Sequence, residues 1–132
     1  TERLKLYREL DAMEDEEDLQ HFIVRLKDRF GPPPKPTTEL FDSLRLRWLA
    51  KDLGLEKLTI KSGKMIGQFI ANQEHPFYQS AKFTYILRSM QQGTPGLRMY
   101  EKNDRLRIVF ESVRDIHEAV KAVKGLTLEE VA

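Results

Sequence analysis

The residue types that most often carry chemistry are few in this sequence and are not spaced for it. The chain has three histidines and no cysteine among its 132 residues. No two histidines lie at the i, i+4 spacing that would place both imidazoles on one metal ion. The absence of cysteine excludes a thiolate metal site, a disulfide scaffold and a cysteine nucleophile. The sequence therefore predicts no metal site.

Two further patterns resemble reactive sites but have simpler interpretations. Asp115, His117 and Glu118 could form an acid–base group. However, an acidic residue followed three positions later by Glu is typical of a helix start. Ser62-Gly63-Lys64 matches only the end of a phosphate-binding loop, because Leu58 stands where that loop requires a glycine, and we interpret it as a hairpin turn. We find no catalytic constellation and expect this domain not to be an enzyme.

Basic residues in the second half of the chain suggest binding rather than reaction. Arg105 and Arg107 alternate with apolar residues, so both point to the strand face opposite the core. With Arg98 and Tyr100, that face could stack and hold nucleic acid. The alternative is a solvated face with cross-strand partners such as Glu101. The chain has 22 Lys and Arg against 21 Asp and Glu, and this balance favours the alternative.

Apolar spacing predicts the elements that position these residues. We expect helices over 3–13, over 15–29, from Thr37 or Thr38 to about 53, from about Pro76 or Ser80 to Gln92, and over 115–125. We expect strands over 55–61, 65–71, 97–101 and 105–111. The unit of strand, hairpin, strand and helix thus occurs twice. This predicts an α+β fold, in which a helical hairpin precedes a four-stranded antiparallel sheet packed on helices.

Side-chain patterns also predict which residues are buried. The second helix has an apolar stripe, and Tyr7 and Trp48 are expected in the core. Gly31 is expected to end the second helix as a left-handed cap. The residues of the stripe are Leu19, Phe22, Ile23, Leu26 and Phe30.

Length and composition place the whole chain in one domain. At 132 residues and 15.5 kDa it is expected to fold as a single unit over 1–132. Within it we distinguish the helical hairpin (1–31), a proline-rich connector (32–36) and the α+β portion (37–132). No run of 18 apolar residues occurs, so we expect no membrane span. Because residue 1 is not Met, we expect a fragment of a longer protein.

An ordered set of motifs resembles the C-terminal domain of the bacterial transcription-repair coupling factors, the Mfd family. The resemblance is clearest over 3–69 and continues more loosely beyond. The motifs are Arg3-Leu4-x-x-Tyr7-Arg8-x-Leu10, Asp28-Arg29-Phe30-Gly31-x-x-Pro34, Leu44-Arg45-Leu46-Arg47 and Leu53-Gly54-Leu55-x-Lys57-Leu58.

The resemblance implies a regulatory interaction domain without a cofactor of its own. It implies a large cytoplasmic parent, an ATP-driven DNA translocase that displaces stalled RNA polymerase and brings in nucleotide excision repair proteins. ATP and Mg would bind in the motor domains of that parent. The C-terminal domain would dock on a UvrB-like N-terminal module of the same protein and cover the surface that recruits UvrA. Docking would therefore be autoinhibitory.

The resemblance also implies a docking face on the second helix. Acidic positions near the end of this helix face arginines of the partner module in the family. Asp28 fits that pattern, whereas Arg25 stands where relatives tend to carry an acid. We take Arg25, Asp28 and Arg29 as docking candidates. The alternatives are a local pair of Asp28 with either arginine, and a nucleic-acid-binding module that uses Arg98, Tyr100, Arg105 and Arg107.

Overall fold

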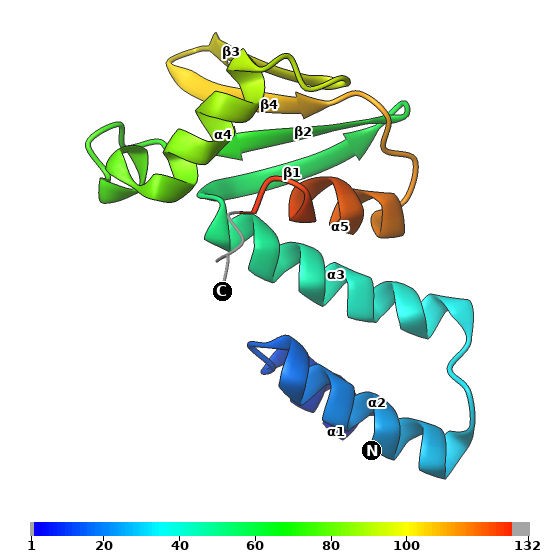
Figure 1. The fold of residues 1–132 in the computed structure, drawn as a ribbon. Helices are drawn as coiled ribbons and strands as arrows, with labels where there is room; N and C mark the ends of the chain where they lie inside the picture. Colours follow the sequence, from blue (N-terminus) through cyan, green and yellow to red (C-terminus); the bar gives the residue numbers. More distant parts are fainter. Residues whose placement is uncertain (1, 128–132) are drawn as a thin grey trace. The chain divides into compact units, whose positions relative to one another are not determined.

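The computed structural model describes residues 2–127, which fold into helices and one sheet in the order expected (Figure 1). The chain divides into two compact units, Thr1–Trp48 and Leu49–Ala132. We call them the helical unit and the sheet unit. The elements are α1 (Glu2–Asp11), α2 (Glu16–Phe30), α3 (Lys35–Asp52), β1 (Leu55–Lys61), β2 (Lys64–Phe69), the 3-10 helix η1 (Pro76–Gln79), α4 (Ala81–Gln91), β3 (Leu97–Lys102), β4 (Arg105–Phe110) and α5 (Ile116–Lys124).

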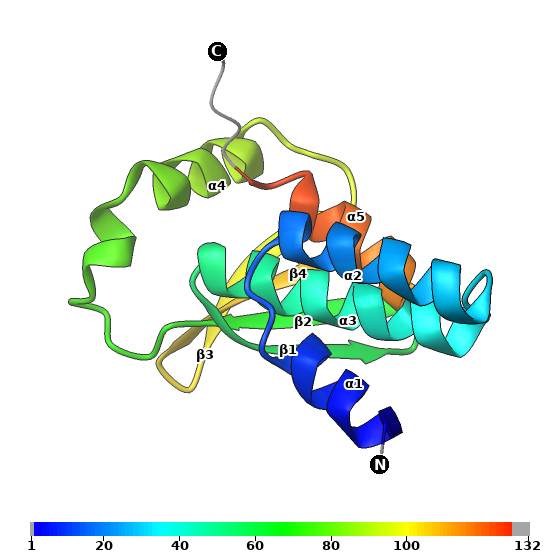
Figure 2. The same cartoon turned by 90° about the horizontal axis from the view of Figure 1, so that it is seen from below.

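The helical unit contains the expected hairpin of α1 and α2 (Figure 2). The Asp15 carboxylate accepts a hydrogen bond of 2.8 Å from the backbone N–H of Asp18 and so caps α2. Gly31 ends α2 with φ of 80° and donates its N–H to the Lys27 carbonyl, which confirms its role as a cap. The buried core of this unit consists of Leu10, Met13, Leu19, Phe22, Phe41 and Leu44.

The start of α3 differs from the expected one. The helix begins at Lys35, before Thr37 and Thr38, because the Pro34 carbonyl accepts the N–H groups of both threonines at 3.0 and 3.1 Å. Pro36 therefore lies in the first turn of the helix. A proline is tolerated there because the N–H groups of the first turn have no partner within the helix. The expected connector over 32–36 is thus shorter than its proline content suggested.

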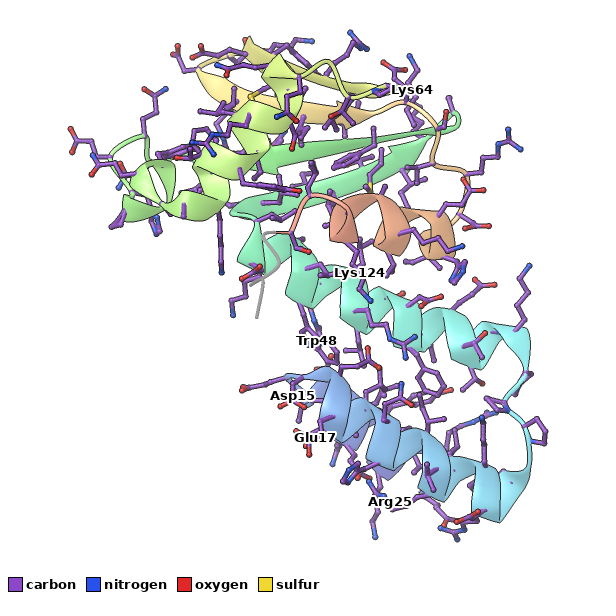
Figure 3. The ribbon with its side chains drawn as sticks, viewed as in Figure 1. Asp15, Glu17, Arg25, Trp48, Lys64 and Lys124 are labelled. Carbon is purple, nitrogen blue, oxygen red and sulfur yellow. The ribbon has the colours of Figure 1, made fainter. Side chains whose placement is uncertain are left out.

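Two aromatic residues expected in the core are exposed. Phe30 is 58% exposed and Tyr7 is 48% exposed. Phe30 is the last residue of α2, and the centre of its ring lies 5.2 Å from the guanidinium carbon of Arg29. By contrast, Trp48 packs against the core of the helical unit and donates its indole N–H to the Met13 carbonyl at 3.1 Å (Figure 3).

The sheet unit confirms the predicted four-stranded antiparallel sheet, with the strand order β1-β2-β4-β3. Both hairpin turns use two residues with positive φ, Ser62-Gly63 and Asn103-Asp104, as right-twisted strands require. The sequence unit of two strands and a helix therefore does occur twice. The large side chains that are almost completely buried in this unit are Leu53, Met65, Phe69, Ile86, Ile108, Val113 and Val123.

Both α4 and α5 lie against the same face of the sheet. Phe83 of α4 packs edge-to-face on Phe69 of β2, with ring centroids 5.8 Å apart. Ala122 of α5 and Leu126, which follows that helix, line one cavity together with Phe110 at the end of β4. Phe69 and Phe110 point to the same side of the sheet, because the register pairs Met65 with Phe110 and strand residues alternate in direction.

Candidate docking and binding surfaces

The predicted docking residues share one side of the end of α2. Arg25, Asp28 and Arg29 follow one another at i, i+3 and i+4, which places them together on a helix surface. All three are exposed, and the Arg25 side chain is 62% exposed. Figure 3 shows Arg25 on α2.

The two arginines are held by α1, whereas the carboxylate between them is not. Arg25 forms an ion pair with Glu9, and Arg29 forms one with Glu2. Within the residues that the structure describes, Asp28 has no ion-pair partner. The local pairing considered for Asp28 is therefore not the one observed. Asp28 presents a negative charge to solvent between two arginines whose charges are already compensated.

An apolar groove that the sequence did not predict lies at the same end of α2, on the side of the helix away from Asp28. It has a volume of about 370 Å³ and is lined in part by Leu26, Phe30 and Leu40 and by the prolines 32–34. Phe30 and Leu40 are also among the most exposed large apolar residues. The sequence does contain a signal for the exposure of Phe30. This residue stands directly before the helix-ending Gly31 and a proline run, so the helix ends before its side chain can reach the core.

The second candidate surface is the sheet face that α4 and α5 leave open. The register forms a row across all four strands by pairing Lys57 with Gln68, Gln68 with Arg107, and Arg107 with Tyr100. We call this side the open face. Its residues are Lys57, Thr59 and Lys61 of β1, Lys64, Ile66 and Gln68 of β2, Arg98, Tyr100 and Lys102 of β3, and Arg105, Arg107 and Val109 of β4.

The predicted position of Arg105 and Arg107 opposite the core is therefore confirmed, and Arg98 and Tyr100 lie on the same side. Four lysines join them, so the open face carries seven cations. These lysines were not among the predicted site residues: three belong to strands distant in sequence, and Lys102 was expected in the turn that follows the third strand. The signal was their period-two alternation with apolar residues such as Leu58. The four are Lys57, Lys61, Lys64 and Lys102.

Two carboxylates pair with cations of the open face. Glu111 contacts Arg98 of β3 at 2.5 Å and Lys64 of β2 at 3.2 Å, so it joins side chains from the two strands on either side of β4. These two hydrogen-bonded cations hold the pKa of Glu111 below its ordinary value. Glu56 contacts Arg105 at 3.1 Å. Glu101, considered as a partner for the arginines, is paired in register with Leu106 on the other side.

The candidate reactive residues have structural roles. Asp115 accepts the Glu118 N–H at 2.8 Å and caps α5, while the Glu118 carboxylate accepts the Arg114 N–H at 3.1 Å. His75 accepts the Phe77 N–H at its Nδ1, which starts η1. No group of three potential metal ligands occurs among the described residues.

The part of the chain that the structure describes has no helix with the length and apolar character needed to cross a membrane.

Comparisons with known proteins agree on one family. The family model of the TRCF domain matches residues 1–80. The transcription-repair-coupling factor of Escherichia coli (strain K12) is 41% identical over 56 residues, which cover 42% of this chain and 5% of that protein. The chain therefore spans only a small part of the length of this relative.

Among solved structures, the crystal structure of a C-terminal domain of transcription-repair coupling factor is similar with a TM-score of 0.67. The match covers 92% of this chain and 80% of that one, at 14% sequence identity. At this identity the likeness shows the fold alone.

Proposed function

The chain belongs to the TRCF domain family, and on this premise we propose that it is a non-catalytic regulatory domain that keeps a transcription-coupled DNA repair translocase inactive. In this proposal it docks on the UvrB-like N-terminal module of the same protein and covers the surface that recruits UvrA. The ATP, Mg²⁺ and RNA polymerase contacts then belong to other parts of the parent protein.

The observation that carries this proposal is the uncompensated carboxylate of Asp28. An autoinhibitory contact must be reversible, and reversible contacts between domains are moderate in area and more polar than permanent ones. The free carboxylate of Asp28 supplies a charge that selects a basic partner. Arg25 and Arg29 contribute by keeping α1 and α2 together, so that Asp28 is presented on a fixed helix.

The affinity of the domain for the N-terminal module must also be low enough for the docked state to be reversible. The domain shifts its parent toward the closed state only by its differential affinity for that state. Because the two are covalently linked, a weak contact suffices when the linker gives a high effective concentration. A small polar interface around Asp28 meets this requirement.

The experiment that tests the proposal is a charge reversal, Asp28→Lys. We expect the affinity of the chain for the isolated N-terminal module, measured by calorimetric titration, to fall at least about tenfold, since an attractive pair becomes a repulsive one. In the full-length parent, the same substitution is expected to increase UvrA binding. The matched control is Glu74→Lys, which makes the same charge change on an exposed loop residue of the sheet unit.

The two readouts separate a docking role from a general electrostatic one. If both variants weaken binding equally, overall charge rather than the end of α2 governs the contact. If Asp28→Lys changes neither titration nor UvrA binding, the autoinhibitory role of this surface is wrong. Binding of the unmodified chain is expected to weaken with added salt, because exposed ion pairs are screened.

A further inference from the structure

The positive charge of the sheet unit is concentrated on its open face. Seven Lys and Arg side chains lie there, and two carboxylates, Glu56 and Glu111, contact them. The remaining described residues of this unit, from 49 to 127, contain six Lys and Arg against six Asp and Glu. The near-neutral composition of the chain therefore conceals a basic surface on one side of the sheet.

Several of these cations are available to a ligand. Within the described residues, Lys57, Lys61, Lys102 and Arg107 have no carboxylate partner.

An aromatic ring lies among these cations. Tyr100 is partly exposed, Arg107 lies directly across from it on β4, and Arg98 and Lys102 flank it along β3. An aromatic ring on an open sheet face can stack on a base, and the surrounding cations can contact the phosphates on either side of that base. Four-stranded sheets with helices on one face bind unpaired bases in this way.

We propose that the open face binds single-stranded nucleic acid, with a base stacked on Tyr100 and the backbone contacting Arg107, Lys57 and Lys102. The row from Lys57 to Tyr100 crosses four strands, about 14 Å at the usual strand spacing. That width accommodates a short single strand. A duplex keeps its bases stacked on one another and would use only the cations, and an acidic peptide would have no base to stack on the ring. This activity is independent of the docking surface, which lies on the helical unit.

The test is a fluorescence anisotropy titration of this chain against a labelled oligothymidylate of about 12 nucleotides, within the usual site size of one such domain. A duplex of equal length and an acidic peptide are titrated in parallel. We expect the single strand to bind more tightly than either. The logarithm of its affinity should fall with the logarithm of salt concentration with a slope of about −3, because four uncompensated cations each contribute about 0.7.

Two aromatic variants test stacking. Tyr100→Leu is expected to weaken single-strand binding about tenfold, because the ring that stacks on the base is lost. Tyr100→Phe keeps the ring and should retain the affinity. Both leave the charge of the open face unchanged, so a difference between them reports on the ring alone.

Three charge variants test the cations. Arg107→Ala should weaken binding and make the salt slope less negative by about 0.7. Arg88→Ala is the matched control, because Arg88 is an exposed arginine of α4 outside the open face, and it should change nothing. Glu111→Gln releases Arg98 and Lys64 and should tighten binding about two- to threefold, because these cations can then pair with a phosphate.

Three outcomes would overturn the proposal. The first is no anisotropy change at low salt. The second is equal losses for Arg107→Ala and Arg88→Ala, which would show non-specific attraction. The third is binding of the duplex or the acidic peptide that exceeds binding of the single strand and is unaffected by Tyr100→Leu. Circular dichroism of every variant checks that the sheet still forms, and the tighter binding expected for Glu111→Gln cannot result from misfolding.

Discussion

Gly54 shows how one residue is required where the chain enters the first strand of the sheet unit. Its φ is 70°, in the region that favours glycine, and its carbonyl accepts the Ile70 N–H at 2.9 Å. A Cβ at this position would lie 2.5 Å from the ring of Phe77. That ring packs with Phe69 and Phe83, so it cannot move without disturbing an aromatic cluster.

We therefore expect Gly54→Ala to lower the free energy of unfolding by about 2–4 kcal/mol, from backbone strain and overpacking together. The matched control is Gly63→Ala in the β1–β2 turn, where φ is 77° but no atom lies within 4 Å of the added Cβ. That change should cost only the strain, about 1–2 kcal/mol. Urea unfolding followed by circular dichroism measures both, and equal losses would mean that contact with Phe77 has no energetic role.

At the residue scale, the direction of side chains along a strand was predictable from the sequence, whereas the ion-pair partners of individual residues were not. The outward direction of Arg105 and Arg107 follows from a period of two along one strand. The partners of Arg25 and Arg29 depend on how α1 packs on α2, which no local pattern specifies. For the same reason the uncompensated charge of Asp28 became visible only in the folded helical unit.

At the scale of elements, α3 joins the helical unit through two arginines of one motif, Leu44-Arg45-Leu46-Arg47. Arg45 donates to both carboxylate oxygens of Glu16, at 2.7 and 2.9 Å, and also contacts Asp42. The hydrogen bonds to Glu16 raise the pKa of Arg45 above its ordinary value. Arg47 contacts Asp11 at 3.1 Å. The motif therefore connects α3 to α1 and to the start of α2.

The two arginines should differ in their contribution to stability. The Arg45 side chain is 24% exposed and bidentate, so Arg45→Ala should lower the free energy of unfolding by about 1–3 kcal/mol. Arg47 and Asp11 are both exposed, and Arg47→Ala should cost at most about 1 kcal/mol. Thermal unfolding of both variants measures the difference. A larger loss for Arg47→Ala would contradict this explanation of the motif.

Most element boundaries were predictable because their signals are local. The range 55–61 for β1 coincides with the observed strand, and Asp15 and Asp115 mark the starts of two helices as caps. The start of α3 was not predictable, because a proline run indicates a break without specifying which proline enters the first turn. The strand order, with β4 between β2 and β3, depends on pairing across the sheet.

At the scale of the whole molecule, charge divides between the two units. The first 48 residues contain nine Lys and Arg and eleven Asp and Glu, which gives a formal charge of −2. Residues 49–132 contain thirteen Lys and Arg and ten Asp and Glu, which gives a formal charge of +3. The two proposed surfaces follow this division. The docking surface relies on a carboxylate of the helical unit, and the open face relies on cations of the sheet unit.

This separation predicts that the two activities can be lost independently. Asp28→Lys should abolish most of the docking and leave single-strand affinity within about twofold at physiological salt, because it changes no residue of the open face and salt screens its longer-range effect. Arg107→Ala should do the reverse. Each variant is titrated separately with the N-terminal module and with the oligothymidylate. A variant that loses both activities together would contradict the assignment of the two functions to separate units.

The same titrations measure whether docking and single-strand binding exclude each other. If the docked module also weakens binding of the single strand, each ligand must weaken the other by the same factor, because coupling between binding sites is reciprocal. Titrating the oligonucleotide in the presence of saturating N-terminal module gives that factor, and the reverse titration must reproduce it. A factor near one means that both surfaces bind at once, so that the autoinhibited parent could still hold a single strand. A large factor means that release of the docked domain and capture of a single strand are one coupled event.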